Sequence, residues 1–443
     1  MAAHPPLVLR DAPLAAVAAD LRRGHTDPAA YVETLQGRAA TVDAEIHAFR
    51  SESGGTDRWA RARERANELT KANSRPATRP PLYGIPVGVK DIFHVDGFET
   101  RAGSDLPPDV LSGPQATAVS RLVDAGAIVL GKTVTAEFAY FDPGATRNPH
   151  DTGHTPGGSS SGSAAAVAAG LCPLALGTQT IGSVIRPAAY CGVVGVKPSY
   201  GRVPTDGVIP AAPSVDTVGY FTQDVAGAKV AAGVLYDDWR ALPTPPERPT
   251  LGVPEGPYLE QADEPGRQAF AAQVDRLSAA GYDVERVSIL DDIAALNERH
   301  TDLVAGEMAL AHETWFSEYA DRYASSTRDL VERGRKTTVR AVARARRSRH
   351  ELRDALENRM DDRAVDVWLA PAAPGPAPSG IDDTGDPVMN LPWTHAGLPA
   401  VSLPAGKTDE GLPLGVQCVA RFGADEDLLS WAEGLAAALP AAP

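Results

Sequence analysis

Serines crowd one short stretch of the chain, PGGSSSGSAAAVAAG at residues 156–170. The pattern G-x-S-x-G, centred here on Ser160, marks hydrolases whose nucleophile stands on a sharp strand-to-helix turn. Such a turn needs a buried strand directly before it, whereas the preceding residues, RNPHDTGHTPGG, are polar and irregular. No motif elsewhere supplies a histidine and an acid to activate Ser160. We therefore expect Ser160, Ser161 and Ser163 to make turn and helix-capping hydrogen bonds.

A second pattern with possible chemistry is GAIVLGKT at residues 126–133, a match to the phosphate-binding sequence G-x-x-x-x-G-K-[ST]. In a working phosphate loop the four intervening residues bend so that their N–H groups face the phosphates. Here those residues are Ala-Ile-Val-Leu, which favour a β-strand. The sequence therefore predicts a strand at this position and no phosphate site.

Two further stretches flank the serine-rich segment, GIPVGVKDIF at 84–93 and LALGTQTIGSVIRPAAYCGVVGVKPSYGRV at 174–203. Two more stretches lie nearer the end of the chain, DPVMNLPWTHAGLPAVSLPAG and PLGVQCVARFG. Together these segments resemble the amidase signature enzymes. The resemblance begins at about residue 80, and the motifs occur in the same order as in that family. That family hydrolyses amides with a Ser–cis-Ser–Lys triad and no cofactor. The resemblance therefore implies an amidase, a hydrolase that acts on linear amide C–N bonds.

The resemblance assigns roles to individual residues. Lys90 of VGVKD matches the family's lysine, Ser159 its bridging serine and Ser183 its nucleophile, which lies 24 residues after Ser159 as the family pattern requires. It also implies a cis peptide bond before Ser159. The expected oxyanion hole consists of the backbone N–H groups of Thr180, Ile181, Gly182 and Ser183.

The chemistry explains why a lysine and two serines suffice. A serine hydroxyl attacks an amide only if a base removes its proton, and a lysine is a base only when neutral, which burial promotes. Lys90 stands in an apolar, strand-like context that is consistent with burial. Ser159 then relays the proton from Ser183 to Lys90, so no histidine is needed. Acylation of Ser183 releases ammonia or an amine, and water then hydrolyses the acyl-enzyme.

The sequence around Ser183 departs from the common family text, D-T-G-G-S-I-R-I-P-A. In QTIGSVIRPA, Gln179 replaces the acid, Ile181 replaces a glycine, and Arg186 lies three residues after the serine. This variant is similar to malonamidase-type members, in which the shifted arginine holds a substrate carboxylate. We hypothesise the same role for Arg186, and its alternative is a structural ion pair.

Three other side chains are candidates for substrate binding. Thr178 and Gln223 fall where the malonamidase-type members have polar active-site residues. Tyr140, within EFAYFDP, is a candidate for lining the acyl site, although an aromatic residue there suits a core equally well.

The elements that must position these residues alternate between strands and helices, which predicts an α/β fold. The resemblance implies an amidase-signature fold with a central mixed β-sheet flanked by helices on both faces. We expect one domain over residues 1–443, joined across a Pro-rich linker at 243–250. Its expected parts are N-terminal helices (1–75), a catalytic signature core (76–242), and a second part (250–443) that completes the sheet and contains a helical region at about 290–363.

Composition excludes several classes of function. The 443 residues are 43% hydrophobic and 22% charged, as in a globular enzyme, and the net charge of −15 argues against nucleic acid as the main partner. The basic run at 333–353 lacks interleaved aromatic residues and is interpreted as a solvated helix face. No apolar run approaches membrane-spanning length, and the first residues lack the apolar segment of a signal peptide.

Cysteine usage points to a reducing compartment. The three cysteines are odd in number, far apart and without metal-ligand spacing, which indicates reduced thiols in a cytoplasmic protein and no metal site: Cys172, Cys191 and Cys418.

The leading interpretation is a free-standing amidase acting on a small-molecule amide. One alternative is the glutaminase-type A subunit of a tRNA-dependent amidotransferase, against which Gln179 and the shifted Arg186 count. An acyltransferase or amide synthase would use the same acyl-enzyme, and a non-catalytic binding module would not need Lys90, Ser159 and Ser183 together. The sequence does not fix the oligomeric state, and a homodimer is compatible with it.

Overall fold

Ten β-strands form one sheet in the computed structural model, which describes residues 6–10, 13–52, 57–242 and 247–440. Part of the predicted linker, residues 243–246, lies outside the described residues. The strands are β1 (Pro86–Lys90), β2 (Ile128–Thr133), β3 (Leu174–Gln179), β4 (Val194–Lys197), β5 (Thr217–Thr222), β6 (Leu251–Glu255), β7 (Val284–Ser288), β8 (Val367–Pro371), β9 (Ala400–Lys407) and β10 (Pro413–Val419).

The strand order is β2-β1-β3-β5-β4-β9-β10-β8-β6-β7. Both ends of the sheet are parallel, with β1 between β2 and β3 and with β6 between β7 and β8. The five pairs from β3 to β8 are antiparallel. The predicted α/β fold with a mixed central sheet is therefore confirmed. Pairing of β4 with β9 joins the strands of the two predicted parts, whose exact boundaries stay a prediction.

Helices cover both faces of this sheet. The helices before the last strand pair are α1 (Leu14–Arg23), α2 (Pro28–Ile46), α3 (Arg58–Ala72), α4 (Thr117–Asp124), α5 (Ser161–Ala168), α6 (Ile185–Cys191), α7 (Val225–Leu235), α8 (Pro257–Glu260), α9 (Glu264–Ala279), α10 (Ile293–Ala311), α11 (Glu313–Tyr319), α12 (Ser325–Lys336), α13 (Val339–Arg363) and α14 (Leu391–Ala396). The described chain ends in α15 (Asp425–Ala438), and short 3-10 turns are η2 (Pro76–Thr78), η3 (Glu137–Ala139) and η4 (Ala320–Arg322).

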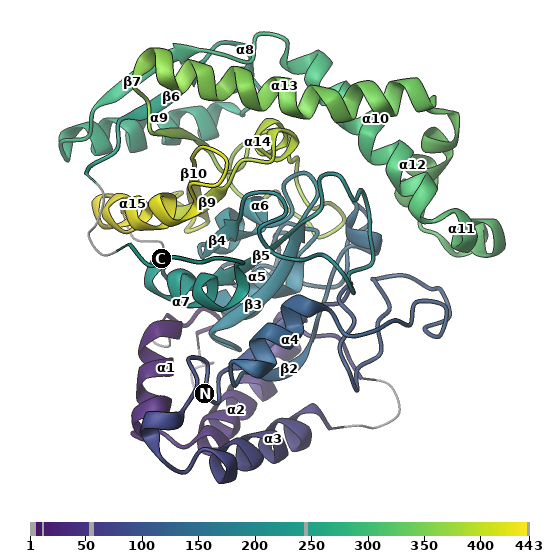
Figure 1. Cartoon of the computed structure of the whole chain (residues 1–443), viewed down its shortest axis with the longest axis vertical. Coiled ribbons are helices and arrows are strands. Elements are labelled where there is room, and N and C mark those ends of the chain that lie inside the picture. The colour runs from purple at the N-terminus through teal and green to yellow at the C-terminus, as the bar shows by residue number, and fades with distance from the viewer. Residues whose placement is uncertain (1–5, 11–12, 53–56, 243–246, 441–443) are drawn as a thin grey trace.

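The helices lie in three places, at the two ends of the molecule and around the middle strands of the sheet. Helices α1 to α3 gather at one end of the molecule, and the long helix α13 crosses the other (Figure 1). Helices α5 and α6 pack on the middle strands and on each other, whereas α7 and α15 pack together against β5 and β9. The predicted helical region at 290–363 becomes α10 to α13 with short breaks.

Close packing explains the small residues of the serine-rich segment. All eight residues of α5 are buried. A Cβ atom on Gly162 would lie 2.1 Å from the carbonyl oxygen of Ala48 and 2.5 Å from the nitrogen of Val134. Because even an alanine does not fit there, Gly162 lets α5 approach the backbone beside β2, and this places the start of the helix next to β3.

The phosphate-loop pattern is a strand, as predicted. Residues Ile128–Thr133 form β2, and Lys132 makes an ion pair of 2.8 Å with the buried carboxylate of Asp91. Lys132 is thus paired with Asp91, the residue that follows the end of β1.

The structure contains no helix, within its described residues, that is both long and apolar enough to cross a membrane. Within the same residues no group of three or more His, Cys, Asp or Glu side chains is arranged to hold a metal ion.

Candidate active site

Lys90 is the last residue of β1, and its side chain is completely buried. Its Nζ donates hydrogen bonds to Ser159 Oγ at 2.8 Å and to Thr178 Oγ1 at 2.9 Å. Among the described residues no carboxylate lies within ion-pair distance of this amine. Burial lowers the pKa of Lys90 to about 7, although the charge of Asp216 opposes that shift. A large fraction of Lys90 is therefore neutral at neutral pH.

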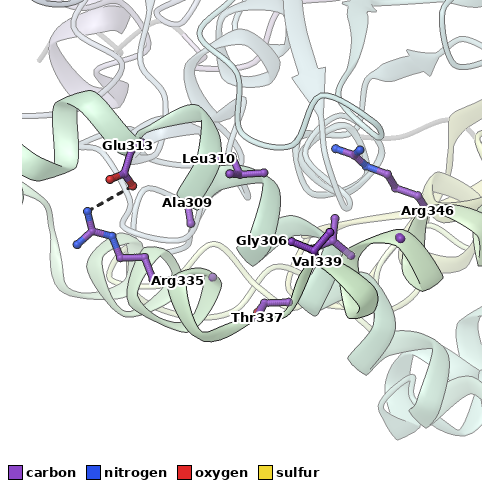
Figure 2. Close-up of a pocket in the computed structure, with 11 residues that line it drawn as sticks. Gly306, Ala309, Leu310, Glu313, Arg335, Thr337, Val339 and Arg346 are labelled. Atoms are coloured by element: carbon purple, nitrogen blue, oxygen red, sulfur yellow. Dashed lines mark hydrogen bonds and ion pairs between the residues drawn. The ribbon is translucent and has the colours of Figure 1, made fainter.

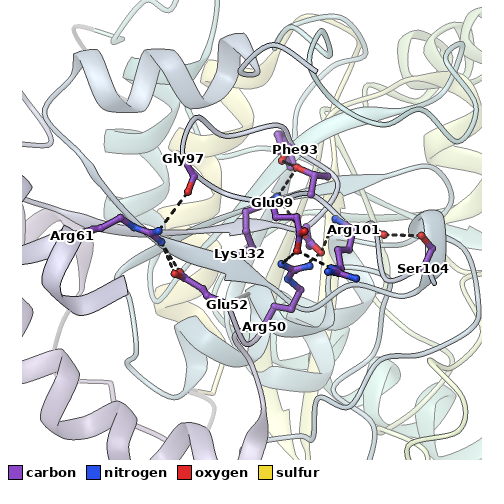
Figure 3. Close-up of polar contacts among 11 residues, drawn as sticks. Arg50, Glu52, Arg61, Phe93, Gly97, Glu99, Arg101, Ser104 and Lys132 are labelled. Atoms are coloured by element: carbon purple, nitrogen blue, oxygen red, sulfur yellow. Dashed lines mark hydrogen bonds and ion pairs between the residues drawn. The ribbon is translucent and has the colours of Figure 1, made fainter. Parts of the chain in front are cut away.

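A polar cluster anchors the chain just after Lys90. Asp91 forms an ion pair with Lys132 and accepts a hydrogen bond from the backbone nitrogen of Arg101 at 3.3 Å. Around it, Arg50 and Arg101 both contact Glu99, at 3.2 Å and 2.8 Å (Figure 3). This cluster holds the end of β1 in place.

Ser159 lies in the turn before α5, and the peptide bond between Gly158 and Ser159 is cis, as the family resemblance implied. The neighbouring serines do not cap the helix, contrary to part of the prediction: Ser160 occupies the N-cap position without a side-chain capping bond. Instead its Oγ donates to the Thr178 carbonyl at 3.2 Å, and Ser163 Oγ donates to the Leu176 carbonyl at 2.8 Å. These two hydroxyls connect the start of α5 to β3, because carbonyl groups of that strand lie within hydrogen-bond distance. Only Ser161 makes a local turn bond, to the Gly157 carbonyl at 2.7 Å.

Gln179, the residue that replaces the family's acid, organises the loop between β3 and α6. Its Oε1 accepts hydrogen bonds from the backbone nitrogens of Val184 at 2.8 Å and Ile185 at 2.9 Å. Its Nε2 donates to Thr394 Oγ1 at 2.9 Å. An amide both accepts and donates, which a carboxylate does not. The sequence marked Gln179 as a departure but contained no sign of its partner Thr394, 215 positions away.

The loop residues 180–183 are held by contacts that the sequence did not reveal. Thr180 Oγ1 donates to Asp216 Oδ1 at 2.6 Å, and the other Asp216 oxygen accepts from the backbone nitrogens of Ala211 and Ala212. Thr394 Oγ1 donates to the carbonyl of Ile181 at 2.7 Å. The backbone N–H groups of Ile181, Gly182 and Ser183 donate to no other residue in the described part of the chain. They are therefore available to a substrate, and the oxyanion hole at residues 180–183 stays a prediction.

A narrow pocket opens beside this loop and is lined by five of the predicted site residues: Tyr140, Thr180, Ile181, Ser183 and Arg186. Its other lining residues are Ala139, Phe141, Ala211, Val304 and Pro387. Ser183 is 7% exposed. Ser159 and Lys90 lie behind the lining, and within the described residues no hydrogen bond joins Ser183 Oγ to Ser159.

Arg186 is a buried cation beside the pocket. One terminal nitrogen donates to the Gly158 carbonyl at 2.8 Å and to Thr384 Oγ1 at 3.1 Å. Its Nε and other terminal nitrogen are buried without a hydrogen-bond partner among the described residues. No carboxylate there forms an ion pair with it, so the alternative of a structural ion pair does not apply to the described chain. Burial lowers the pKa of this guanidinium.

Two predicted substrate ligands have other roles. Thr178 faces Lys90, to which it is hydrogen bonded, and it does not line the pocket. Gln223 follows the end of β5 that lies away from the loop, because β5 runs antiparallel to β3 and pairs its first residue, Thr217, with Gln179. Its amide donates to the carbonyls of Leu9 at 2.6 Å and Val167 at 3.2 Å. Gln223 thus does not line the pocket that contains Ser183, and nothing in the described structure supports its predicted role in substrate binding.

A larger groove of about 550 Å³ lies between α10, α12 and α13 (Figure 2). Its lining includes Ala309, Leu310 and Val339 and, at its rim, Arg335 and Arg346. None of the predicted catalytic residues faces it. The groove is therefore distinct from the pocket that contains Ser183.

Comparison with known proteins agrees with this geometry. The family model "Amidase" matches residues 30–429. The chain belongs to the amidase signature family. A solved structure described as an amidase is 33% identical and superposes with a TM-score of 0.87, covering 97% of this chain and 100% of the other. The peptide amidase of Stenotrophomonas maltophilia is 26% identical, with a TM-score of 0.80 and 98% of each chain covered. The glutamyl-tRNA(Gln) amidotransferase A subunit of Prochlorococcus marinus (strain MIT 9313) is 33% identical over 92% of this chain and 93% of its own. The protein is thus an amide-hydrolysing enzyme.

Proposed function

We propose that this amidase is a free-standing enzyme that hydrolyses a small, carboxylate-bearing amide through an acyl-enzyme on Ser183. The observation that carries the proposal is the contact of 2.8 Å between Lys90 Nζ and Ser159 Oγ in a fully buried setting. A neutral lysine beside a hydroxyl that leads toward a pocket serine is the arrangement that general-base catalysis without histidine requires.

In the proposed first half-reaction, Lys90 takes the proton of Ser159 as Ser159 takes that of Ser183. The Oγ of Ser183 attacks the amide carbon, and the N–H groups of the 180–183 loop receive the negative charge on the carbonyl oxygen. The hydrogen bond between Ser183 and Ser159 forms when substrate is bound. The proton then passes back through Ser159 to the leaving nitrogen, and the C–N bond breaks.

In the second half-reaction a water molecule replaces the amine. Lys90 removes its proton through Ser159, the hydroxide adds to the acyl carbon, and the collapsing intermediate returns the proton to Ser183 Oγ. The products are a carboxylic acid and ammonia or an amine. An acyltransferase would use an amine or alcohol in place of water, so it would form little acid until such an acceptor is added, whereas a hydrolase forms the acid in water alone.

Arg186 supports the proposed substrate class. Its two unpartnered nitrogens are buried next to Ser183, and no carboxylate of the described chain forms an ion pair with them, although the charges of Asp383 and Asp386 act on the guanidinium from further away. A buried guanidinium is best stabilised by a bidentate carboxylate, and a substrate acid group supplies one. The malonamidase-like role hypothesised for Arg186 is therefore retained as part of this proposal.

The amidotransferase A subunit is the second candidate, because several curated relatives at 31–33% identity over most of the chain have that name. Such an enzyme would need partner proteins. The replacement of the family acid by Gln179 and the position of Arg186 favour the free-standing enzyme instead. The three cysteines are free and buried, which supports the cytoplasmic location proposed here.

The deciding experiment uses the purified chain alone. Ammonia release is measured from matched amides with and without a carboxylate, from glutamine, and from carbamates and ureas, with hydroxylamine as a competing acyl acceptor. We expect turnover of a carboxylate-bearing amide and none by a Ser183→Ala variant. Activity confined to glutamine in the presence of the amidotransferase partner proteins would contradict the proposal.

A further inference from the structure

Two buried histidines lie in contact behind the loop that precedes Ser183. His300 comes from α10 and His395 from α14, and both side chains are completely buried. Their Nδ1 atoms are 3.0 Å apart, and the rings meet edge to face with centroids 5.3 Å apart. Neither residue lines the pocket, so neither touches substrate.

The partners of this pair determine where its protons are. His300 Nε2 lies 3.2 Å from the carbonyl oxygen of Thr180, and a carbonyl only accepts, so Nε2 of His300 bears a proton. In a neutral ring Nδ1 of His300 is then bare, and the contact with His395 is a hydrogen bond only if Nδ1 of His395 bears its proton. Nε2 of His395 is left as an acceptor, 2.8 Å from the hydroxyl of Ser348. That hydroxyl has one proton, which it donates to the Ala345 carbonyl at 2.9 Å, so it donates to His395 only when it turns away from that carbonyl.

Both rings have physical reasons to stay neutral. Burial lowers the pKa of His300 to about 4, and burial together with His300 lowers the pKa of His395 further. The charges that face the pair, Arg349 on α13 and Arg299 on α10, are positive and act in the same direction. A second proton on either ring would place a positive charge in a buried site that already faces two arginines, and this is unfavourable.

The hydrogen bonds of the pair therefore point in one direction, from Nδ1 of His395 to His300 and from Nε2 of His300 to the Thr180 carbonyl. In a trans peptide the carbonyl and the following N–H point to opposite sides of one plane. A donor that holds the Thr180 carbonyl thus aims the N–H of Ile181 the other way. Thr394, the residue before His395, holds the Ile181 carbonyl at 2.7 Å and aims the N–H of Gly182 by the same geometry.

We propose that His300 and His395 are positioning residues that orient the backbone N–H of Ile181 toward the oxyanion formed on the substrate. This inference rests on the proposed function of the 180–183 loop as an oxyanion hole. Helix α14 then aims two successive donors, one directly through Thr394 and one through the histidine pair. The loop needs such external support because its N–H groups make no hydrogen bond to the described protein.

The first test reads the tautomers directly and does not depend on activity. Nitrogen-15 spectra of histidine-labelled enzyme should show His300 protonated at Nε2 and His395 at Nδ1, both neutral between about pH 6 and about pH 8. Assignment uses the His300→Gln and His395→Gln variants. Equal tautomers on the two rings, or a ring that titrates within that interval, would overturn the inference.

The second test separates orientation from stability. His300→Leu removes the donor to Thr180 and should lower kcat by about 10- to 100-fold with little change in KM, as expected for a misdirected oxyanion donor. His300→Gln keeps an N–H donor of similar reach and should recover most of kcat. The matched control is His150→Leu, which removes a partly buried imidazole that contacts a backbone carbonyl, that of Cys191 at 3.0 Å, away from the loop. It should keep the wild-type kcat.

The outcomes distinguish this inference from the proposed function. If Ser183→Ala abolishes amide hydrolysis while His300→Leu and His300→Gln both retain wild-type kcat, the positioning role is refuted and the catalytic proposal stands. If the wild-type enzyme hydrolyses no amide, the catalytic proposal fails and the oxyanion role of the pair fails with it. The tautomers then still show whether the pair is ordered as inferred. A loss of kcat in His300→Leu that glutamine does not restore, with His150→Leu equally impaired, means a structural role only.

Discussion

The pH dependence of kcat/KM tests whether Lys90 is the base. Burial lowers its pKa to about 7, and the neutral amine, which is the active form, predominates above that value. For a single titrating group about a tenth of the enzyme is active one pH unit below the pKa and about nine-tenths one unit above it. We therefore expect kcat/KM for a non-ionising amide to rise about tenfold from pH ~6 to pH ~8 and then to level off.

A second buried lysine provides the matched control. Burial also lowers the pKa of Lys197 to about 7, but its Nζ contacts the carbonyls of Pro198 and Leu398 and it does not line the pocket. Initial rates of ammonia release are measured at constant ionic strength for the wild type, Lys90→Met and Lys197→Met. Lys90→Met should lose nearly all activity, whereas Lys197→Met should keep the profile and its midpoint. The histidines at the site do not interfere, since burial lowers the pKa of His300 to about 4.

The same substitution has a predicted effect on stability with a definite sign. Lys90 binds a proton in the unfolded chain up to its ordinary pKa of 10.5 but loses it in the folded protein above about 7. The free energy by which burial of Lys90 destabilises the folded protein therefore decreases as pH rises from about 7 to 10.5, and it increases as pH falls toward 7. Lys90→Met should unfold at higher temperature than the wild type, with a larger gain at pH ~7 than at pH ~10. A flat or alkaline-shifted activity profile, or a destabilised Lys90→Met, would refute the assignment of Lys90 as a buried neutral base.

Three further substitutions test neighbouring side chains. Arg186→Ala should lower kcat/KM for carboxylate-bearing amides at least about tenfold more than for neutral amides, and equal losses would exclude a role in carboxylate recognition. Thr178→Val removes one of the two close contacts of Lys90 and should lower kcat by about fivefold with KM unchanged; a change in KM alone would instead indicate substrate contact. Gln223→Ala should lower the free energy of unfolding by about 1 kcal/mol in urea titrations and leave kcat/KM unchanged, since its amide binds the Leu9 and Val167 carbonyls.

The role of Gln179, which replaces the family's acid, becomes clear only from its contact with Thr394, which is distant in the chain. In the sequence it is only a replaced acid beside Ser183. In the fold its amide closes the loop onto the first turn of α6 and reaches Thr394, which in turn holds the Ile181 carbonyl. Gln179 accepts hydrogen bonds in the first of these contacts and donates one in the second, so the two together require a group that does both, such as an amide.

The sequence by itself determined the order of the elements and the three residues proposed to perform the chemistry. Apolar runs predicted β2 and so argued against a phosphate loop at residues 126–133. The resemblance to the amidase signature family implied the roles of Lys90, Ser159 and Ser183, because the family's motifs are short and local in the chain. The close contact of Lys90 with Ser159 follows from their positions at the ends of neighbouring buried elements.

Only the tertiary structure decided which way the remaining polar side chains face and what they contact. Gln223 was assigned to the site from its position in the chain, yet the antiparallel pairing of β5 with β3 puts it at the opposite end of the strand. His300 and His395 stand 95 positions apart, and they meet only because α10 and α14 pack together. A hydrogen bond depends on the direction and separation of two groups in space. For partners this far apart in the chain, the packing of helices and the register of strands set both.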